Sequence, residues 1–294
     1  MQRLVECVPN FSEGRRPEVV QHIATAIAAV DTACVLDRHI DPDHNRSVIT
    51  FVAAPEHAVG AAVAGVRRAS ELIDIRVHKG VHPRLGATDV LPFVPVRGVT
   101  IDDCVALAHQ AGERIARELA IPVYYYERAA LRPDRVNLED VRRGAQLQSL
   151  PDAGPAVFHE SAGAIVIGAR PFLIAFNVVL HTDDVAIARQ IARTIRARNG
   201  GLPFLKALGF QLQTRSMVQV SMNLVNYQVT GMGAAYEAIR READTLGVEI
   251  ESAEIVGLVP SNALDREAEY FGKLQNFTEA TILENQIEKC FRAG

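Results

Sequence analysis

The stretch VQVSMNL, residues 218–224, alternates apolar and polar side chains without a break. Successive side chains of a strand point to opposite faces, so Val, Val, Met and Leu share one face while Gln, Ser and Asn share the other. The strands of a doubly wound parallel sheet are buried on both faces and lack this alternation. The stretch therefore favours an α/β sandwich in which helices cover only one face of the sheet.

The segments on either side of this stretch alternate strand-like and helix-like runs, and the second half of the chain repeats the style of the first. In the first half we expect strands over 4–8, 34–40, 47–54, 90–96 and 121–126, and helices over 17–30, 56–73 and 100–119. In the second half we expect strands over 172–180, 218–224 and 248–256, and helices over 182–200, 231–246 and 278–291. Two prolines within 90–96 predict an edge strand or an irregular one. The order indicates the α/β (α+β) class, with two ferredoxin-like βαββαβ sandwich subdomains.

A length of 294 residues also favours two domains, because single cores stop growing near this size. Residues 144–164 are dominated by Pro, Gly, Ser and Ala and show no hydrophobic period, which is typical of a connection. We therefore expect an N-terminal subdomain over 1–150, a linker over 151–166 and a C-terminal subdomain over 167–294.

Charge and composition exclude several classes of protein. A formal net charge of −4 gives no general attraction to nucleic acid or to anionic membranes. The basic stretch 132–143 contains three carboxylates and is interpreted as a solvated helix and loop. The richest apolar run, 172–180, is far shorter than the roughly 20 residues of a membrane span. Glu6 stands where a signal peptide would be apolar, so a cytoplasmic protein without nucleic-acid or membrane partners is expected.

The densest polar cluster is RVHKGVHPRLGATD, residues 76–89, between two apolar elements. His78 and His82 have the spacing of two metal ligands on a helix, but Gly80 and Pro83 disfavour a helix there, and no metal is expected. One histidine acting as a general base fits better, because its ordinary pKa suits proton transfer at neutral pH. A solvated connection is the alternative for this cluster.

Two smaller polar clusters have simpler interpretations. Residues 37–46, DRHIDPDHNR, start like a calcium-binding loop but lack its glycine and its distal glutamate, so a β-turn is expected. Residues 10–14 are interpreted as a turn followed by a helix cap. The common nucleotide-binding and serine-hydrolase motifs are absent from the sequence.

Five segments together resemble the glutamate formimidoyltransferases of histidine breakdown, the formiminotransferase family. The segments are LVECVPNFSEG (4–14), HKGVHPRLGATDVLPFVPVRG (78–98), GARPFLIAFNVVL (168–180), QVSMNL (219–224) and VGLVP (256–260). The resemblance implies a homodimer of chains with two α/β subdomains. It also implies a cleft between the subdomains that binds two small-molecule substrates, tetrahydrofolate as co-substrate and formimidoylglutamate.

The resemblance assigns roles to particular residues. His82, which precedes Pro-Arg-Leu-Gly, corresponds to the family's catalytic histidine and would act as general acid and base. The family's folate segment corresponds to the stretch around 165–174, which contributes the candidates Ile165, Val166, Gly168, Ala169 and Arg170.

Further binding candidates follow from the chemistry of the substrates, which both carry glutamate carboxylates. Arginine and lysine bind carboxylates, and the candidates are Arg46, Lys79, Arg84 and Arg170. Asn10 and Asn177 lie beside apolar runs and are candidates for hydrogen bonds to the pterin edge. An ordinary buried hydrogen bond is the alternative for Asn177, and core packing is the favoured interpretation of the three tyrosines at 124–126.

Two positions depart from the family pattern. The family usually has an acidic residue immediately before the catalytic histidine and another two residues after Asp37, where this chain has Val81 and His39. Asp41 and Asp43, with Asp37, are the neighbouring carboxylates that could substitute. A folate-binding relative without transferase activity is therefore the alternative function.

Overall fold

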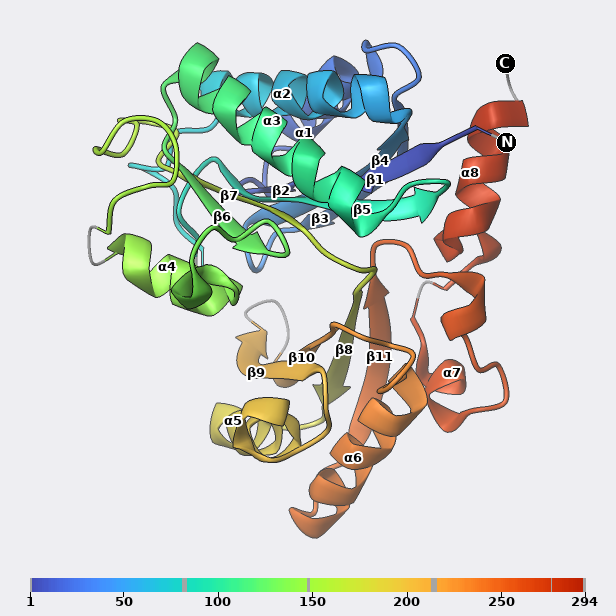
Figure 1. Cartoon of the computed structure of the whole chain (residues 1–294). Coiled ribbons are helices and arrows are strands. Elements are labelled where there is room, and N and C mark those ends of the chain that lie inside the picture. The colour runs from blue at the N-terminus through green and yellow to red at the C-terminus, as the bar shows by residue number, and fades with distance from the viewer. Residues whose placement is uncertain (1, 81–83, 147–148, 213–215, 276, 293–294) are drawn as a thin grey trace. The chain divides into compact units, whose positions relative to one another are not determined.

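The computed structural model describes residues 2–80, 84–146, 149–212, 216–275 and 277–292 (Figure 1). The chain divides into two compact units, Met1–Pro171 and Phe172–Gly294. Each unit has a sheet of its own with helices packed on it, which confirms the predicted fold class of two α/β subdomains.

The first unit begins with a ferredoxin-like βαββαβ arrangement. Its elements are β1 (Leu4–Cys7), β2 (Asn10–Phe11), α1 (Pro17–Ala28), β3 (Cys34–Asp41), β4 (Arg46–Ala53), α2 (Pro55–Leu72) and β5 (Thr88–Arg97). β1 and β2 act as one interrupted strand, which pairs with β4 on one side and β5 on the other, while β3 pairs with β4. All of these pairings are antiparallel, as the one-faced alternation of the sequence predicts.

The first unit then extends its sheet with a further segment. The added elements are α3 (Ile101–Leu119), β6 (Val123–Glu127), the short 3₁₀ turn Pro133–Arg135, α4 (Leu138–Gln146) and β7 (Ile165–Ala169). β7 lies between β5 and β6 and is parallel to both. A capping box between Thr100 and Asp103 begins α3, as the sequence predicts.

Of the two alternatives predicted for 90–96, the irregular strand is confirmed by register shifts in its pairing with β1 and β2, and the edge strand is wrong. β5 is central, with β1 and β2 on one side and β7 on the other. Pro92 has no N–H to donate, but it lies opposite the interruption between β1 and β2, where the regular ladder is broken and its carbonyl only accepts from the backbone N–H of Val8 at 3.3 Å. Pro95 lies where the register with β1 shifts.

The helices α1, α2 and α3 cover one face of the seven-stranded sheet (Figure 1). The fully buried side chains of Val5, Phe51, Phe93 and Ile167 point into this layer. The opposite face, here called the first polar face, bears Glu6, Asn10, Asp37, His39 and Arg46 in strand positions that alternate with the core positions. α4 packs on the part of this face formed by Tyr124, Tyr126 and Val166.

The chain leaves the first unit later than the expected linker. Residues 151–164 are tied to the first unit by backbone hydrogen bonds, such as Val123 N–H to Ala153 at 2.9 Å and Ala164 N–H to Leu85 at 3.1 Å. β7 follows directly and belongs to the first sheet. The described residues 149–164 therefore belong to the connection between α4 and β7 within the first unit.

The second unit is a ferredoxin-like βαββαβ fold with no added strand among its described residues. Its elements are β8 (Ile174–Leu180), α5 (Val185–Ile195), β9 (Leu205–Leu212), β10 (Met217–Leu224), α6 (Met232–Thr245) and β11 (Ile250–Val256), in the sheet order β11-β8-β10-β9. α7 (Glu269–Lys273) and α8 (Leu283–Arg292) follow, and short 3₁₀ turns lie at Ala197–Asn199, Ser261–Ala263 and Glu279–Thr281. The alternation within 218–224 is confirmed, because the side chains of Val218, Val220, Met222 and Leu224 are at most 1% exposed in the helix-covered core.

The strand β9 was not predicted. Its residues Leu205 and Ala207 face the core, but Leu208 and Phe210 pair with the polar side of β10, so apolar residues occur on both faces and hide the period. Among the described residues, no helix has the length and apolar character needed to cross a membrane.

Candidate active site on the first sheet

A β-bulge at Asp89 organises the polar end of the first sheet. The pairing of β5 with β2 passes from Thr88 opposite Phe11 to Val90 opposite Asn10, and so skips Asp89. A bulge re-aims the side chain of the extra residue. The Asp89 carboxylate is fully buried, and a buried charge of this kind requires partners.

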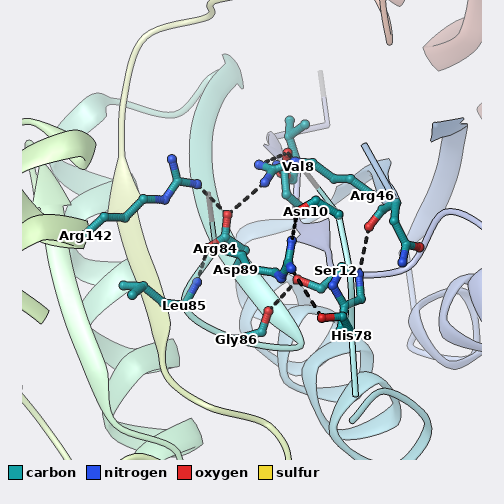
Figure 2. Close-up of polar contacts among 12 residues, drawn as sticks. Val8, Asn10, Ser12, Arg46, His78, Arg84, Leu85, Gly86, Asp89 and Arg142 are labelled. Atoms are coloured by element: carbon teal, nitrogen blue, oxygen red, sulfur yellow. Dashed lines mark hydrogen bonds and ion pairs between the residues drawn. The ribbon is translucent and has the colours of Figure 1, made fainter. Parts of the chain in front are cut away.

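Three segments supply those partners (Figure 2). Arg46, at the start of β4, donates from Nη1 to Oδ2 of Asp89 at 2.9 Å, and Arg142 of α4 donates to the same oxygen. The backbone N–H of Leu85 donates to Oδ1 at 2.9 Å. One carboxylate thus joins β4, α4 and the loop that leads into β5.

Asn10 completes the orientation of Arg46. Its side-chain oxygen accepts from Nη2 of Arg46 at 2.8 Å and from Nε at 3.2 Å, while its amide donates to the carbonyl of Val8 at 2.7 Å. The guanidinium is therefore held on two sides, by a carboxylate and by an amide.

The cluster has more positive than negative charge. Burial lowers the pKa of Arg46, and the Asp89 carboxylate partly offsets that effect. Burial likewise lowers the pKa of Arg84, whose guanidinium donates to the carbonyls of Gly80 at 3.2 Å and His78 at 3.4 Å. Arginine stays charged even so, and three cations beside one carboxylate favour an anionic ligand.

Asn45 attaches the segment 78–80 to the β3–β4 turn. Its backbone has φ of +48°, a left-handed conformation that asparagine adopts more readily than most residues. Its side chain accepts from Gly14 N–H at 2.9 Å and donates to the carbonyl of Lys79 at 2.8 Å. A Cβ at Gly80 would lie 2.5 Å from the carbonyl oxygen of His44, so the close approach of the two segments requires glycine.

His78 is held as a neutral base. Its Nε2 lies 3.0 Å from the carbonyl oxygen of Asn45, which only accepts, so Nε2 carries the hydrogen. Burial lowers the pKa of His78, and the Arg84 cation lowers it further. Its Nδ1 is buried and has no hydrogen-bond partner, which leaves a free lone pair next to the arginine cluster.

Glu6 is a second unusual group on the first polar face. Its side chain is buried, and desolvation raises its pKa to about 7, against the opposing effect of the Arg170 cation. Its Oε2 has no hydrogen-bond partner. Glu6 therefore changes charge near neutral pH.

The face of the second sheet opposite α5 and α6, here called the second polar face, has a different composition. It bears Asn177, Gln219, Ser221, Ser252 and Glu254, which pair across β8, β10 and β11. Asn177 is buried and donates to Glu254 at 3.3 Å, while its side-chain oxygen has no partner.

Comparison with known proteins identifies the family. The family model described as Formiminotransferase domain, N-terminal subdomain matches residues 4–170, and the model described as Formiminotransferase domain matches residues 175–290. The chain belongs to the formiminotransferase family. It is therefore a transferase, as the resemblance predicts.

Full-length relatives agree with this assignment. The chain is 50% identical to a glutamate formimidoyltransferase of Thermoplasma acidophilum, with 98% of each chain covered. It is 42% identical to a glutamate formimidoyltransferase of Streptococcus pyogenes, over 98% of this chain and 99% of the relative. A formimidoyltransferase-cyclodeaminase of Rattus norvegicus is 44% identical over 94% of this chain, which spans 54% of that longer protein.

Within this family assignment, the structure brings together three of the predicted site residues. Asn10 and Arg46 are in direct contact, and Arg84 lies close enough for Asp89 to affect its pKa. Lys79 has an exposed side chain, and Asn177 belongs to the other unit. His82, the predicted catalytic histidine, and Val81 lie outside the described residues.

The described chain on both sides of residues 81–83 is nevertheless fixed. Asn45 holds Lys79 and His78 on one side, as described above. On the other side Asp89 holds Leu85, and the Ser12 hydroxyl donates to the carbonyl of Gly86 at 2.7 Å. Both flanks are therefore anchored to the first sheet.

The predicted folate segment coincides with β7 and the residue after it. Ile165 and Ala169 point into the helix-covered core, whereas Val166 packs in the cluster beneath α4. Gly168 lies under Tyr126, since a Cβ there would be 2.5 Å from a ring carbon. Arg170 follows the strand, and its cation lowers the pKa of Glu6.

The tyrosines at 124–126 are core residues, as predicted. Their exposed fractions are 1–4%. Tyr125 faces the helices, where it contacts His109, and Tyr124 and Tyr126 face α4. Burial raises the pKa of all three hydroxyls.

His39 lies on the first polar face, opposite Val48. Of the carboxylates considered as substitutes for the acidic residue, Asp41 accepts from His44 Nδ1 at 2.6 Å and from its backbone N–H at 2.9 Å. Although burial opposes them, these hydrogen bonds lower the pKa of Asp41, whereas burial raises the pKa of Asp37. Asp41 is thus already committed to the β3–β4 turn.

Sequence reasoning missed Asp89 and Arg142. Asp89 belongs to the polar cluster 76–89, but nothing in the sequence marks it as a bulge. Arg142 lies in the stretch interpreted as a solvated helix, and for this residue that interpretation is wrong: its side chain is only 13% exposed. Among the described residues, no group of three or more His, Cys, Asp or Glu side chains is arranged to hold a metal ion.

Proposed function

We propose that this transferase is a glutamate formimidoyltransferase. It moves the formimidoyl group from N-formimidoyl-L-glutamate to N5 of tetrahydrofolate. The observation that carries the proposal is the excess of positive charge around Asp89, from Arg46, Arg142 and Arg84, in a chain of net charge −4. Both substrates carry glutamate carboxylates, and guanidinium groups bind carboxylates with paired hydrogen bonds. The printed names of the two full-length relatives support the same reaction.

The chemistry requires two proton transfers. N5 of tetrahydrofolate attacks the amidine carbon, and a tetrahedral intermediate forms. The bond from that carbon to the glutamate nitrogen then breaks. The attacking amine loses a proton and the leaving nitrogen gains one, so a single histidine can serve first as base and then as acid. We assign that role to His82, on the family resemblance.

The fixed arginine cluster would supply the remaining rate enhancement by positioning the two substrates. General acid–base catalysis contributes roughly 10²–10⁴-fold, and the correct positioning of two substrates contributes more. Tetrahydrofolate is the co-substrate in this proposal. Because the amidine carbon is already electrophilic, the chemistry needs neither metal nor ATP. A place in histidine degradation, a cytoplasmic location and a homodimer accompany this proposal as predictions.

The test is direct. Purified protein is mixed with formimidoylglutamate and tetrahydrofolate, the mixture is acidified, and the near-ultraviolet absorbance of methenyltetrahydrofolate is read. The wild type should give signal and His82→Ala should give none. His181→Ala, an exposed histidine of the second unit, is the control and should behave like the wild type.

Other outcomes would change the assignment. Turnover by His82→Ala but not by His78→Ala would move the base to His78, whose Nδ1 is free. Tetrahydrofolate binding without turnover by the wild type would support the alternative, a folate-binding relative in which His39 replaces the usual acidic residue.

A further inference from the structure

Two adjacent arginines of α4 have opposite environments. The Arg143 side chain is 60% exposed and pairs with Asp140 at 3.3 Å, as expected of a helix surface. The Arg142 side chain is 13% exposed, contacts Asp89, and has a buried Nε with no hydrogen-bond partner. A buried donor without a partner costs free energy, so Arg142 is under-used in the structure as it stands.

The charge of the cluster is also unbalanced. Arg46 and Arg142 share one oxygen of Asp89, so one carboxylate faces two guanidinium groups, and Arg84 adds a third cation within electrostatic range. One arginine would neutralise Asp89. A second buried guanidinium is costly unless another anion is present for part of the working cycle.

We infer that Arg142, oriented together with Arg46 by Asp89, binds a carboxylate of a glutamyl group. This inference rests on the proposed function, which brings two glutamyl compounds to the site: the formimidoyl donor and the tail of tetrahydrofolate. The unpartnered Nε–H of Arg142 lies beside the Nη2 group that Asp89 holds, and it is a charged donor of the kind that a carboxylate oxygen accepts. Asp89 acts as a positioning residue, because it holds both forks and contacts no substrate itself.

The experiment compares Arg142→Gln, Arg142→Lys and the matched control Arg143→Gln in the full chain. Initial rates are measured while each substrate is varied separately. Arg142→Gln should raise KM for one glutamyl substrate by about 10- to 100-fold, the range for a lost charge-assisted hydrogen bond, and change kcat less. Arg142→Lys keeps the charge but lacks the planar guanidinium, so its KM should lie between those of the wild type and Arg142→Gln. Arg143→Gln should have the KM of the wild type.

Two arms identify the source of the carboxylate. A rise in KM for formimidoylglutamate alone assigns Arg142 to the donor. A rise in KM for tetrahydrofolate alone assigns it to the folate tail. In that case tetrahydropteroate, which lacks glutamate, should be used equally well by the wild type and Arg142→Gln. If Arg142→Gln does not fold, Arg142→Lys, which can still pair with Asp89, carries the comparison.

Binding without turnover separates this inference from the proposed function. N-formyl-L-glutamate and tetrahydrofolate are titrated singly into each variant by calorimetry. A wild type that does not catalyse transfer but binds one of them through Arg142 would keep the inference and end the proposed function. Transfer with both KM values and both affinities independent of Arg142 would overturn the inference, and Arg142 would then be only a structural partner of Asp89.

Discussion

The two sheets share the βαββαβ order and the same arrangement of their core strands, but their polar faces differ. The first carries charged groups, Asp89 with Arg46 and Arg142, together with the buried Glu6. The second is mostly uncharged, and a side-chain hydrogen bond between its strands joins Asn177 to Glu254. Both helix-covered faces are apolar. The shared topology therefore supplies two scaffolds, and a bulge and an added α4 give one of them its charges.

The largest effect should follow from neutralising the centre of the first polar face. Asp89→Asn leaves two largely buried guanidinium groups without a counter-charge, which should lower the free energy of unfolding by about 3–5 kcal/mol. Urea denaturation measures the loss. Asp103→Asn, an exposed member of the α3 capping box, is the control and should lose about 1 kcal/mol. If Asp89→Asn lowers the free energy of unfolding no more than Asp103→Asn does, the buried charges of the first polar face do not depend on Asp89, and the contrast between the two faces is wrong.

A smaller effect should appear in the pH dependence of stability, to which Glu6 on the first polar face contributes. The folded pKa of Glu6 is about 7, above its ordinary 4.5, so the native state holds a proton that the unfolded chain releases. Glu6 therefore reduces stability as pH rises from 4.5 to 7, by about 3 kcal/mol in total. Glu6→Gln should match the wild type at pH 4.5 and exceed its thermal stability at pH 8.

The control for Glu6 is an exposed glutamate of the same unit. Hydrogen bonding to Arg114 lowers the pKa of Glu118, so Glu118→Gln should show no gain in stability at high pH. Equal melting temperatures for wild type and Glu6→Gln from pH 5 to pH 8 would contradict the assigned burial of a protonated Glu6.

The smallest effect is expected on the second polar face. Asn177→Ala removes one hydrogen bond to Glu254 and a side-chain oxygen that has no partner, so the loss should be about 1 kcal/mol. A loss as large as that of Asp89→Asn would remove the contrast between the faces. The KM for tetrahydrofolate in this variant tests whether Asn177 contacts the pterin, which is still a prediction.

The fold was largely predictable because a strand with one buried face has an alternation of apolar and polar residues in its sequence. β10 is the clearest case. β9 was missed because Leu208 and Phe210 lie on the side that should be polar. The two prolines of β5 predict either an edge strand or an irregular strand, and the structure has the irregular one. The interruption between β1 and β2 and a register shift make the prolines acceptable at the centre of the sheet, which the sequence does not reveal.

The site was less predictable, for a physical reason. The chemistry of their side chains marks Asn10, Arg46 and Arg84 as binding candidates in the sequence, and they do lie together. Their common partner Asp89 is selected by a register skip, which no residue pattern in the sequence displays. Arg142 is 53 residues from Asp89 along the chain, and only the packing of α4 on the sheet distinguishes it from the exposed Arg143.

That separation of 53 residues has a consequence for synthesis on the ribosome. Residues up to Arg97 can complete the first βαββαβ core before α4 has been made. Until α4 docks, Asp89 has Arg46 but lacks Arg142, so a nascent chain can be compact and still lack the arginine that we infer binds the substrate carboxylate. Substrate binding would then report that the last helix of the first unit is in place, and not merely that its core has folded.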